Sequence, residues 1–306
     1  MSDITVVYIA GQGRSGSTLL DLLAGRLDGW FSMGEFRLFW HAVRDEYRCA
    51  CGEPVLECPV WSDVLARSQT AAVTDVLADL KATVRFRRVP GLLAPALLGS
   101  HRAARDRSAR ALGDVYRAVA ESTGASVLVD SSKDPIYGLL LRGAPGIKLH
   151  VVHLVRDPRA VAWSWQRKRV RPEVVEREAY QPVYSALHTS LEWDLRNALV
   201  HVLGRGAAGY ARVTYEALVD DPAGALARIE RAVTGTGDGG ADAAAALAAA
   251  TGGVELVNHT VAGNPMRFEG AFAVKPDEEW KHALGRRDRR LVAALTWPLL
   301  RWYGYI

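Results

Sequence analysis

The sequence predicts an α/β protein in which helices cover both faces of a parallel sheet. Short apolar runs rich in β-branched residues alternate with segments of helical periodicity along the chain. A glycine-rich loop at residues 11–18 separates the first apolar run from a helical segment, as in phosphate-binding loops. We therefore expect a P-loop-like, doubly wound parallel sheet flanked by helices, with an inserted helical lobe at residues 36–122.

The expected strands are the apolar runs that end in polar residues. Four such runs are found, at residues 4–10, 126–130, 148–155 and 210–213. A further strand is expected shortly before Glu35, and helices that start with proline are expected at Pro135 and Pro158. The alanine-rich segment 236–253 favours a surface helix.

Length, composition and charge limit the kind of protein. A chain of 306 residues that is 49% hydrophobic can bury the core of one domain, expected at 1–306. A net charge of +4, from 38 Lys and Arg against 34 Asp and Glu, suits a small anionic ligand better than a nucleic acid. The apolar stretch 89–98 is too short for a membrane span and no leader precedes the first strand, so a soluble cytoplasmic protein is expected.

The glycine-rich loop differs from an ATP-binding loop at one position. Gly11 and Gly16 keep the Walker spacing, but Ser17 stands where the lysine that reaches the β- and γ-phosphates belongs. Arg14 supplies positive charge within the loop instead. The alternative interpretation is a tight glycine-rich turn with a solvated arginine.

The run Gly13-Arg14-Ser15-Gly16-Ser17-Thr18 resembles the 5′-phosphosulfate loop of sulfotransferases that use 3′-phosphoadenosine-5′-phosphosulfate (PAPS). The resemblance implies that these residues bind the 5′-phosphosulfate of the donor through main-chain N–H groups and hydroxyls. The pair Arg156 and Ser164, eight residues apart, resembles the family's 3′-phosphate motif. A bidentate arginine followed by a hydroxyl two helical turns later suits a terminal phosphate.

Three further segments extend the resemblance. Lys133-Asp-Pro resembles a motif of tyrosylprotein and related sulfotransferases whose lysine reaches the transferring sulfuryl group. Tyr215-Glu resembles a segment whose tyrosine lies near the nucleotide. The segment 254–270 resembles a C-terminal loop that closes over the nucleotide, which makes Arg267 a candidate ligand of the 3′-phosphate, although the RKGxxGDW form of the cytosolic family is absent.

Sulfuryl transfer needs a base for the acceptor's proton and cations for the charge on the leaving nucleotide. Arg14 and Lys133 are the candidate cations. The resemblance implies that Glu35 is the base, because it matches the catalytic glutamate of tyrosylprotein and several bacterial sulfotransferases, whereas cytosolic members use a histidine. The pKa of Glu35 is expected to be raised by neighbouring aromatic residues. Glu35 could also be an ordinary glutamate at a helix start, in which case His41 or Asp130 are the next candidates. His153 lies in an apolar strand and is expected to be a satisfied core histidine.

The cysteines leave more alternatives open. Cys49, Cys51 and Cys58 form a compact cluster that favours buried thiols or a disulfide, with zinc as a further alternative. The aromatic residues around Glu35 fit either an acceptor-stacking surface or ordinary core. These residues are Trp30, Phe31, Phe36, Phe39 and Trp40.

The sequence thus predicts transfer of a sulfuryl group from PAPS to a hydroxyl of a small molecule, carbohydrate or natural product, giving PAP and a sulfate ester. No metal is expected in the reaction. The rival hypotheses are a nucleotide kinase-like P-loop enzyme and a non-catalytic nucleotide-binding protein. The expected partner is a small-molecule acceptor, without nucleic acid or membrane insertion, and a homodimer is allowed.

Overall fold

The structure is a computed structural model of the chain. It describes residues 3–68, 72–94, 102–168, 170, 180–235, 243–245, 247–248, 257–268 and 274–306. Most of the predicted surface helix at 236–253 lies outside the described residues, although 243–245 and 247–248 are helical. Among the described residues, no helix combines the length and apolar character that a membrane span requires.

Five parallel strands form one sheet in the order β2-β3-β1-β4-β5. The strands are β1 (Ile4–Gly11), β2 (Trp30–Ser32), β3 (Val127–Lys133), β4 (Ile147–Val155) and β5 (Gly209–Thr214). The chain places β2 and β3 on one side of β1 and then crosses to the other side for β4 and β5. A ligand crevice is expected at the carboxyl ends of the strands beside such a change of direction. The predicted α/β fold is confirmed.

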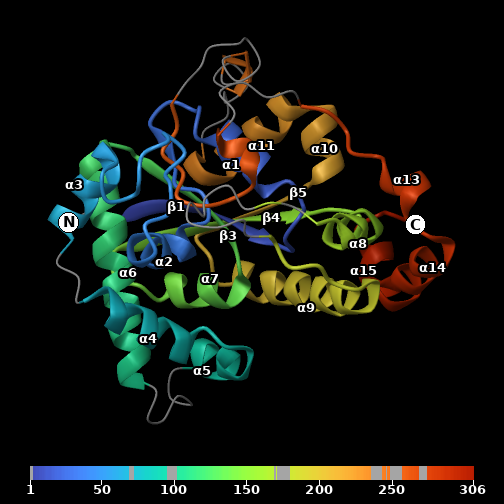
Figure 1. Cartoon of the computed structure of the whole chain (residues 1–306), viewed down its shortest axis with the longest axis horizontal. Helices are drawn as coiled ribbons and strands as arrows, with labels where there is room; N and C mark the ends of the chain where they lie inside the picture. The colour runs from blue at the N-terminus through green and yellow to red at the C-terminus, as the bar shows by residue number, and fades with distance from the viewer. Residues whose placement is uncertain are drawn as a thin grey trace.

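Helices cover both faces of the sheet (Figure 1). One face carries α1 (Ser17–Ala24), α10 (Tyr215–Asp220) and α11 (Pro222–Thr234). The opposite face carries α6 (Arg102–Thr123), α7 (Pro135–Arg142) and α9 (Ala186–Gly204). At the right of this view, α8 (Pro158–Gln166), α13 (Trp280–Ala283), α14 (Arg286–Leu295) and α15 (Trp297–Trp302) form a group of helices next to α9.

The central strand explains why both faces must be covered. Val6 and Tyr8 of β1 pack into the core on one side, whereas Val7 and Ile9 pack into the core on the other. All four side chains are at most 1% exposed. Alternate side chains of a strand point to opposite faces, so β1 is apolar along its length rather than in alternation.

The predicted inserted lobe between β2 and β3 is helical in its described parts. It contains η1 (Phe36–Leu38), α2 (Phe39–Arg44), α3 (Pro59–Arg67), α4 (Val73–Thr83), η2 (Phe86–Arg88), α5 (Val89–Leu93) and α6. Phe36, Phe39 and Trp40 are at most 3% exposed. The rings of Phe36 and Phe39 pack against Trp61 of α3, and Trp40 packs against Phe39. These three rings therefore belong to the core rather than to an acceptor-stacking surface.

The two predicted proline-led helix starts are capped as expected. Asp134 accepts hydrogen bonds from the N–H groups of Ile136 and Tyr137, and Asp157 accepts one from the N–H of Arg159. These caps fix the turns that follow β3 and β4. The residues preceding them, Lys133 and Arg156, therefore lie at the carboxyl edge of the sheet.

Candidate functional site

The phosphate loop leaves the carboxyl end of β1 and enters α1 at Ser17. Gly16 has a φ of 87°, and a Cβ there would lie 2.6 Å from a ring carbon of Tyr215. Glycine is therefore required both for the backbone conformation and for the close approach of the tyrosine. Ser15 is buried, and no described residue offers its hydroxyl a hydrogen bond.

Two predicted nucleotide-binding residues, Arg156 and Tyr215, meet beside this loop. The guanidinium of Arg156 lies 4.2 Å from the ring centroid of Tyr215, whose ring also packs against Gly16. Nη1 of Arg156 donates to the carbonyl oxygen of Arg14 at 3.0 Å. Segments that are far apart in the sequence thus converge on one face of the loop.

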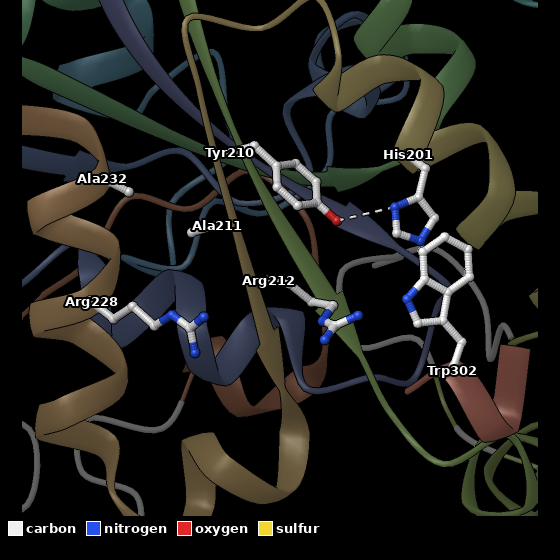
Figure 2. Close-up of a pocket in the computed structure, with 7 residues that line it drawn as sticks. All are labelled: His201, Tyr210, Ala211, Arg212, Arg228, Ala232 and Trp302. Atoms are coloured by element: carbon white, nitrogen blue, oxygen red, sulfur yellow. Dashed lines mark hydrogen bonds between the residues drawn. The ribbon is translucent and has the colours of Figure 1, made fainter. Parts of the chain in front are cut away.

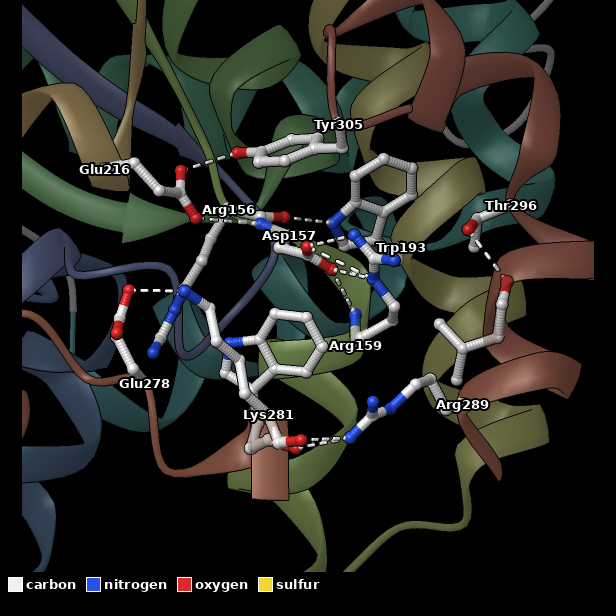
Figure 3. A network of polar contacts seen from close by, with 12 residues as sticks. Arg156, Asp157, Arg159, Trp193, Glu216, Glu278, Lys281, Arg289, Thr296 and Tyr305 are labelled. Atoms are coloured by element: carbon white, nitrogen blue, oxygen red, sulfur yellow. Dashed lines mark hydrogen bonds and ion pairs between the residues drawn. The ribbon is translucent and has the colours of Figure 1, made fainter. Parts of the chain in front are cut away.

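A polar network holds Arg156 in place (Figure 3). Its carbonyl oxygen accepts from the indole of Trp193 at 3.1 Å. Glu216 follows Tyr215 in the sequence and accepts a hydrogen bond at 2.7 Å from the hydroxyl of Tyr305, which lies near the C-terminus. The N–H of Asp157 donates to Oε1 of Glu216 at 3.4 Å, so these contacts tie the end of β4 to α9 and to the last residues of the chain.

An acidic residue not predicted from the sequence occupies the far side of Arg156. The carboxylate of Asp277 lies 3.1 Å from Nη2 of Arg156, and the carbonyl oxygen of Asp277 accepts from the same nitrogen at 3.2 Å. No motif surrounds Asp277, so this contact was not predictable from the residues around it. A buried arginine paired with a surface carboxylate can exchange that partner for a phosphate.

Ser164 and its neighbour lie on α8, which packs against the phosphate loop. Ser164 is 3% exposed, and the ring of Trp165 fills the space that a Cβ of Gly13 would occupy. The guanidinium of Arg14 stacks 4.7 Å from the Trp165 ring centroid and bonds the side chain of Gln181. Trp165 and Gln181 were not predicted, although Trp165 is adjacent to a motif residue.

The predicted base and the predicted lysine form an ion pair. Nζ of Lys133 lies 2.6 Å from Oε1 of Glu35, and the two side chains are 13% and 16% exposed. Lys133 has a φ of 66°, an uncommon conformation for a residue other than glycine. The N–H of Glu35 donates to the carbonyl oxygen of Ala262 at 2.9 Å, which fixes the glutamate backbone.

Opposing effects set the charge of this pair. Burial alone would raise the pKa of Glu35, but Lys133, Arg37 and Arg14 together bring that pKa below its ordinary value. The expectation that aromatic neighbours raise this pKa is therefore wrong, because the nearby cations outweigh the burial. Arg37 was not predicted, although it lies only two residues beyond Glu35. The carboxylate is ionised at neutral pH, as a base must be.

A second buried carboxyl lies under the site. Asp21 of α1 is fully buried, and burial raises its pKa to about 8. The hydroxyl of Ser32, at the end of β2, donates to Oδ2 of Asp21 at 2.5 Å. The sequence did contain a signal for this residue, because Asp21 is the one polar residue among Leu19–Ala24.

The alternative bases have other partners. Asp130 is fully buried and accepts from Tyr116 and Ser132, so it does not contact Lys133. Burial raises its pKa to about 6.

The two histidines considered as bases also have partners. His41 is hydrogen-bonded to Arg44 at 3.3 Å near the surface. His153 is a satisfied core histidine, as predicted, bonded to Tyr210 and Asn197 at 2.8 Å each.

The segment 257–268 lies over the phosphate loop, and Arg267 within it donates to main-chain carbonyl oxygens. The N–H of Asn264 donates to the hydroxyl of Thr18 at 3.2 Å. The guanidinium of Arg267 is 1% exposed and donates to the carbonyl oxygens of Thr260 and Arg48 at 2.6 and 2.9 Å. Arg267 therefore connects this segment to the helical lobe.

A cavity of about 440 Å³ lies at the edge strand β5, apart from these residues (Figure 2). Trp302 stacks on His201 there with ring centroids 4.9 Å apart. Arg212 and Arg228 add positive charge to the lining. None of the residues predicted from the motifs lines this cavity.

Comparisons with known proteins agree with this architecture. No protein family profile matches the sequence, and no curated protein is significantly similar to it. The solved sulfotransferase domain of the Synechococcus PCC 7002 olefin synthase has a TM-score of 0.51 and 20% identity, covering 96% of this chain and 94% of that one. A sulfotransferase domain from the curacin biosynthetic pathway has a TM-score of 0.49 and 16% identity, with coverages of 96% and 98%. The first similarity confirms, at the level of the fold, the resemblance predicted from the motifs.

Proposed function

We propose that the protein transfers a sulfuryl group from PAPS to the hydroxyl of a small molecule, carbohydrate or natural product. The observation that carries the proposal is the ion pair of Glu35 and Lys133, 2.6 Å long, in the electrostatic field of Arg14 from the phosphate loop. A protein that only binds a nucleotide has no need for a half-buried base beside two cations. The fold of solved sulfotransferase domains is consistent with this activity.

The residues around the loop fit the two phosphate-bearing ends of the donor. The buried Ser15 hydroxyl, to which no described residue is hydrogen-bonded, and the N–H groups at the start of α1 suit the 5′-phosphosulfate. Arg156, stacked on Tyr215 and paired with Asp277, suits the 3′-phosphate, which would replace the Asp277 carboxylate. Ser164, on the following helix, is the proposed second donor to that phosphate.

The proposed reaction is an in-line displacement. The acceptor oxygen attacks the sulfur, the bond from sulfur to the bridging oxygen of the nucleotide breaks, and PAP leaves. Glu35 accepts the proton of the acceptor hydroxyl, whereas Lys133 and Arg14 stabilise the charge on the sulfuryl group and the bridging oxygen. The lowered pKa of Glu35 keeps the carboxylate ready to accept that proton at neutral pH.

Calorimetry with PAP, ATP and GTP tests the donor. We expect PAP to bind without Mg²⁺, because arginine, hydroxyl and main-chain donors meet its phosphates. Arg156→Ala should weaken PAP far more than adenosine-5′-phosphosulfate, which has no 3′-phosphate. The matched control is Arg228→Ala, which removes an exposed arginine at the β5 cavity. Equal losses for both ligands would remove Arg156 from the 3′-phosphate site.

Incubation with ³⁵S-labelled PAPS and a panel of hydroxyl acceptors tests turnover. Labelled sulfate ester together with stoichiometric PAP supports the proposal. Magnesium-dependent binding of ATP in preference to PAP would instead favour the kinase-like hypothesis. Tight PAP binding without transfer to any acceptor class would favour the non-catalytic one.

A further inference from the structure

We propose that Cys49, Cys51, Cys58 and His259 form a structural zinc site that joins the helical lobe to the segment 257–268. The three cysteines lie within ten residues of one another, whereas His259 comes from about 200 residues further along the chain. The four ligand atoms lie within 4.8 Å of one another. The fold therefore supplies the fourth ligand that the cysteine spacing alone does not show.

Three of the six separations between the ligand atoms are close to the edges of a zinc tetrahedron. Sγ of Cys58 lies 3.2 Å from Nδ1 of His259 and 3.6 Å from Sγ of Cys49, and Sγ of Cys49 lies 3.8 Å from the same Nδ1. Zinc bonds of about 2.3 Å to sulfur and 2.0–2.1 Å to nitrogen place tetrahedral ligands about 3.5–3.8 Å apart. An ion therefore fits between these atoms with small side-chain movements.

The local backbone presents the thiols toward one point. The N–H of Gly52 donates to the carbonyl oxygen of Cys49 at 3.0 Å, which closes a tight turn around Cys51. Gly52 has a φ of 97°, so the turn depends on glycine. Cys58 lies at the N-cap of α3, where the helix dipole favours a thiolate.

The histidine is also held in place from outside the cluster. The indole N–H of Trp61 donates to the carbonyl oxygen of His259 at 2.8 Å, and the N–H of Ala50 donates to that of Thr260 at 3.1 Å. Cys49 and Cys58 are fully buried, and all three cysteines are free thiols. Three thiols and an imidazole are the ligand set of structural Zn²⁺, and four protein ligands leave no open position for catalysis.

The site has a consequence for the phosphate loop. The residues that follow His259 contact the candidate active site through Ala262, which accepts from the Glu35 N–H, and Asn264, which donates to Thr18. Zinc at Cys49, Cys51, Cys58 and His259 would fix the start of this segment. Loss of the zinc should therefore loosen the contacts around Glu35 without removing any group that touches the substrates.

Metal analysis of the full-length protein, purified without added metal, tests the site directly. We expect about one zinc per chain by elemental analysis and three titratable thiols after denaturation in chelator. The absence of zinc even after dialysis against Zn²⁺ would overturn the proposal, and so would a count of one thiol, which indicates a disulfide.

Cobalt substitution tests the ligands separately from stability. Co²⁺ bound to the wild-type protein should give the intense visible bands of a tetrahedral site and the near-ultraviolet charge transfer of thiolate ligands. His259→Asn and Cys51→Ser should each weaken and shift these bands, whereas His282→Asn, which alters an exposed histidine of α13, should leave them unchanged. If a variant fails to fold, release of zinc from the wild-type protein by an organomercurial in proportion to thiol modification provides the same test. Unchanged bands in both ligand variants, or zinc release independent of thiol modification, would overturn the assignment.

Discussion

Glu35 and Lys133 neutralise each other before any substrate arrives, and their separation decides how the site can work. At 2.6 Å the lysine holds the carboxylate in its ionised form and must share it with the acceptor hydroxyl during the reaction. Burial raises the pKa of Glu35 and lowers the pKa of Lys133. Each group therefore keeps its charge in this site because the other is present. Glu35 and Lys133 should therefore be treated as one ion pair, because a change in either residue alters the charge of the other.

Replacement of Glu35 with glutamine tests its role as the base. Glutamine keeps the size of the side chain but cannot accept the proton, so kcat should fall by about 10²–10⁴. PAP affinity, measured by calorimetry, should change little because Glu35 is not a proposed phosphate ligand. Near-normal turnover would move the base to another residue, and Asp130 would be the next to replace.

Replacement of Lys133 with methionine should shift the pH profile. Burial raises the pKa of Glu35 and Lys133 is the leading cation that lowers it, so without that cation the pKa rises. The acidic limb of kcat/KM should then move to higher pH, because the base becomes protonated at a higher pH than in the wild-type protein. Lys133→Arg keeps the charge and should keep the limb near its original position. An unmoved limb in the methionine variant would show that Lys133 does not control the base.

At the scale of elements, the phosphate loop depends on how closely Tyr215 approaches Gly16. Gly16→Ala adds a Cβ 2.6 Å from the tyrosine ring at a position with a φ of 87°. We expect PAP affinity to fall by tenfold or more, because the ring and Arg156 must move away from the loop. The control is Gly235→Ala, where φ is 73° but no atom lies within 4 Å. That variant should lose about 1–2 kcal/mol of stability at most and keep its PAP affinity. Equal affinities in the two variants would contradict the packing argument.

The ends of the elements were harder to predict than their order. The apolar run at 126–130 predicts a strand that ends at Asp130, yet β3 continues to Lys133 because Ser131 and Ser132 are buried against the lobe. A prediction based on hydrophobic periodicity does not identify polar residues as part of a strand. The capped turns at Asp134 and Asp157 were predictable, since the aspartate before proline is a local signal.

At the scale of the whole molecule, the sheet explains why distant motifs could be assigned to one site. Arg14 and Arg156 follow β1 and β4, and Lys133 is the last residue of β3; these three strands are neighbours in the sheet, and parallel strands end at the same edge. The partners supplied by other segments were not predictable. Asp277 lies in a segment without periodicity or motif, and the contact of His259 with the cysteines depends on tertiary packing between distant segments.

Asp21 should make the stability of the whole protein depend on pH. Its pKa is about 8 in the folded protein and about 3.8 in the unfolded chain, so the folded state binds more protons between these values. The free energy of unfolding should therefore lose up to about 1.4 kcal/mol per pH unit from this residue as the pH rises through that window. Asp130 contributes in the same direction below its pKa of about 6, and Glu35 in the opposite direction at lower pH.

Asp21→Asn isolates the contribution of this carboxyl. Asparagine can still accept the hydrogen bond from Ser32 but has no proton to release, so the variant should lose this part of the pH dependence. In urea unfolding between pH 5 and pH 8, its stability relative to the wild-type protein should increase steadily with pH. Asp220→Asn, which replaces an exposed carboxylate at the end of α10, provides the matched control and should run parallel to the wild-type curve. Parallel curves for Asp21→Asn as well would mean that Asp21 is already ionised in the fold. The nearby Lys133 would then be its counter-ion as well as that of Glu35.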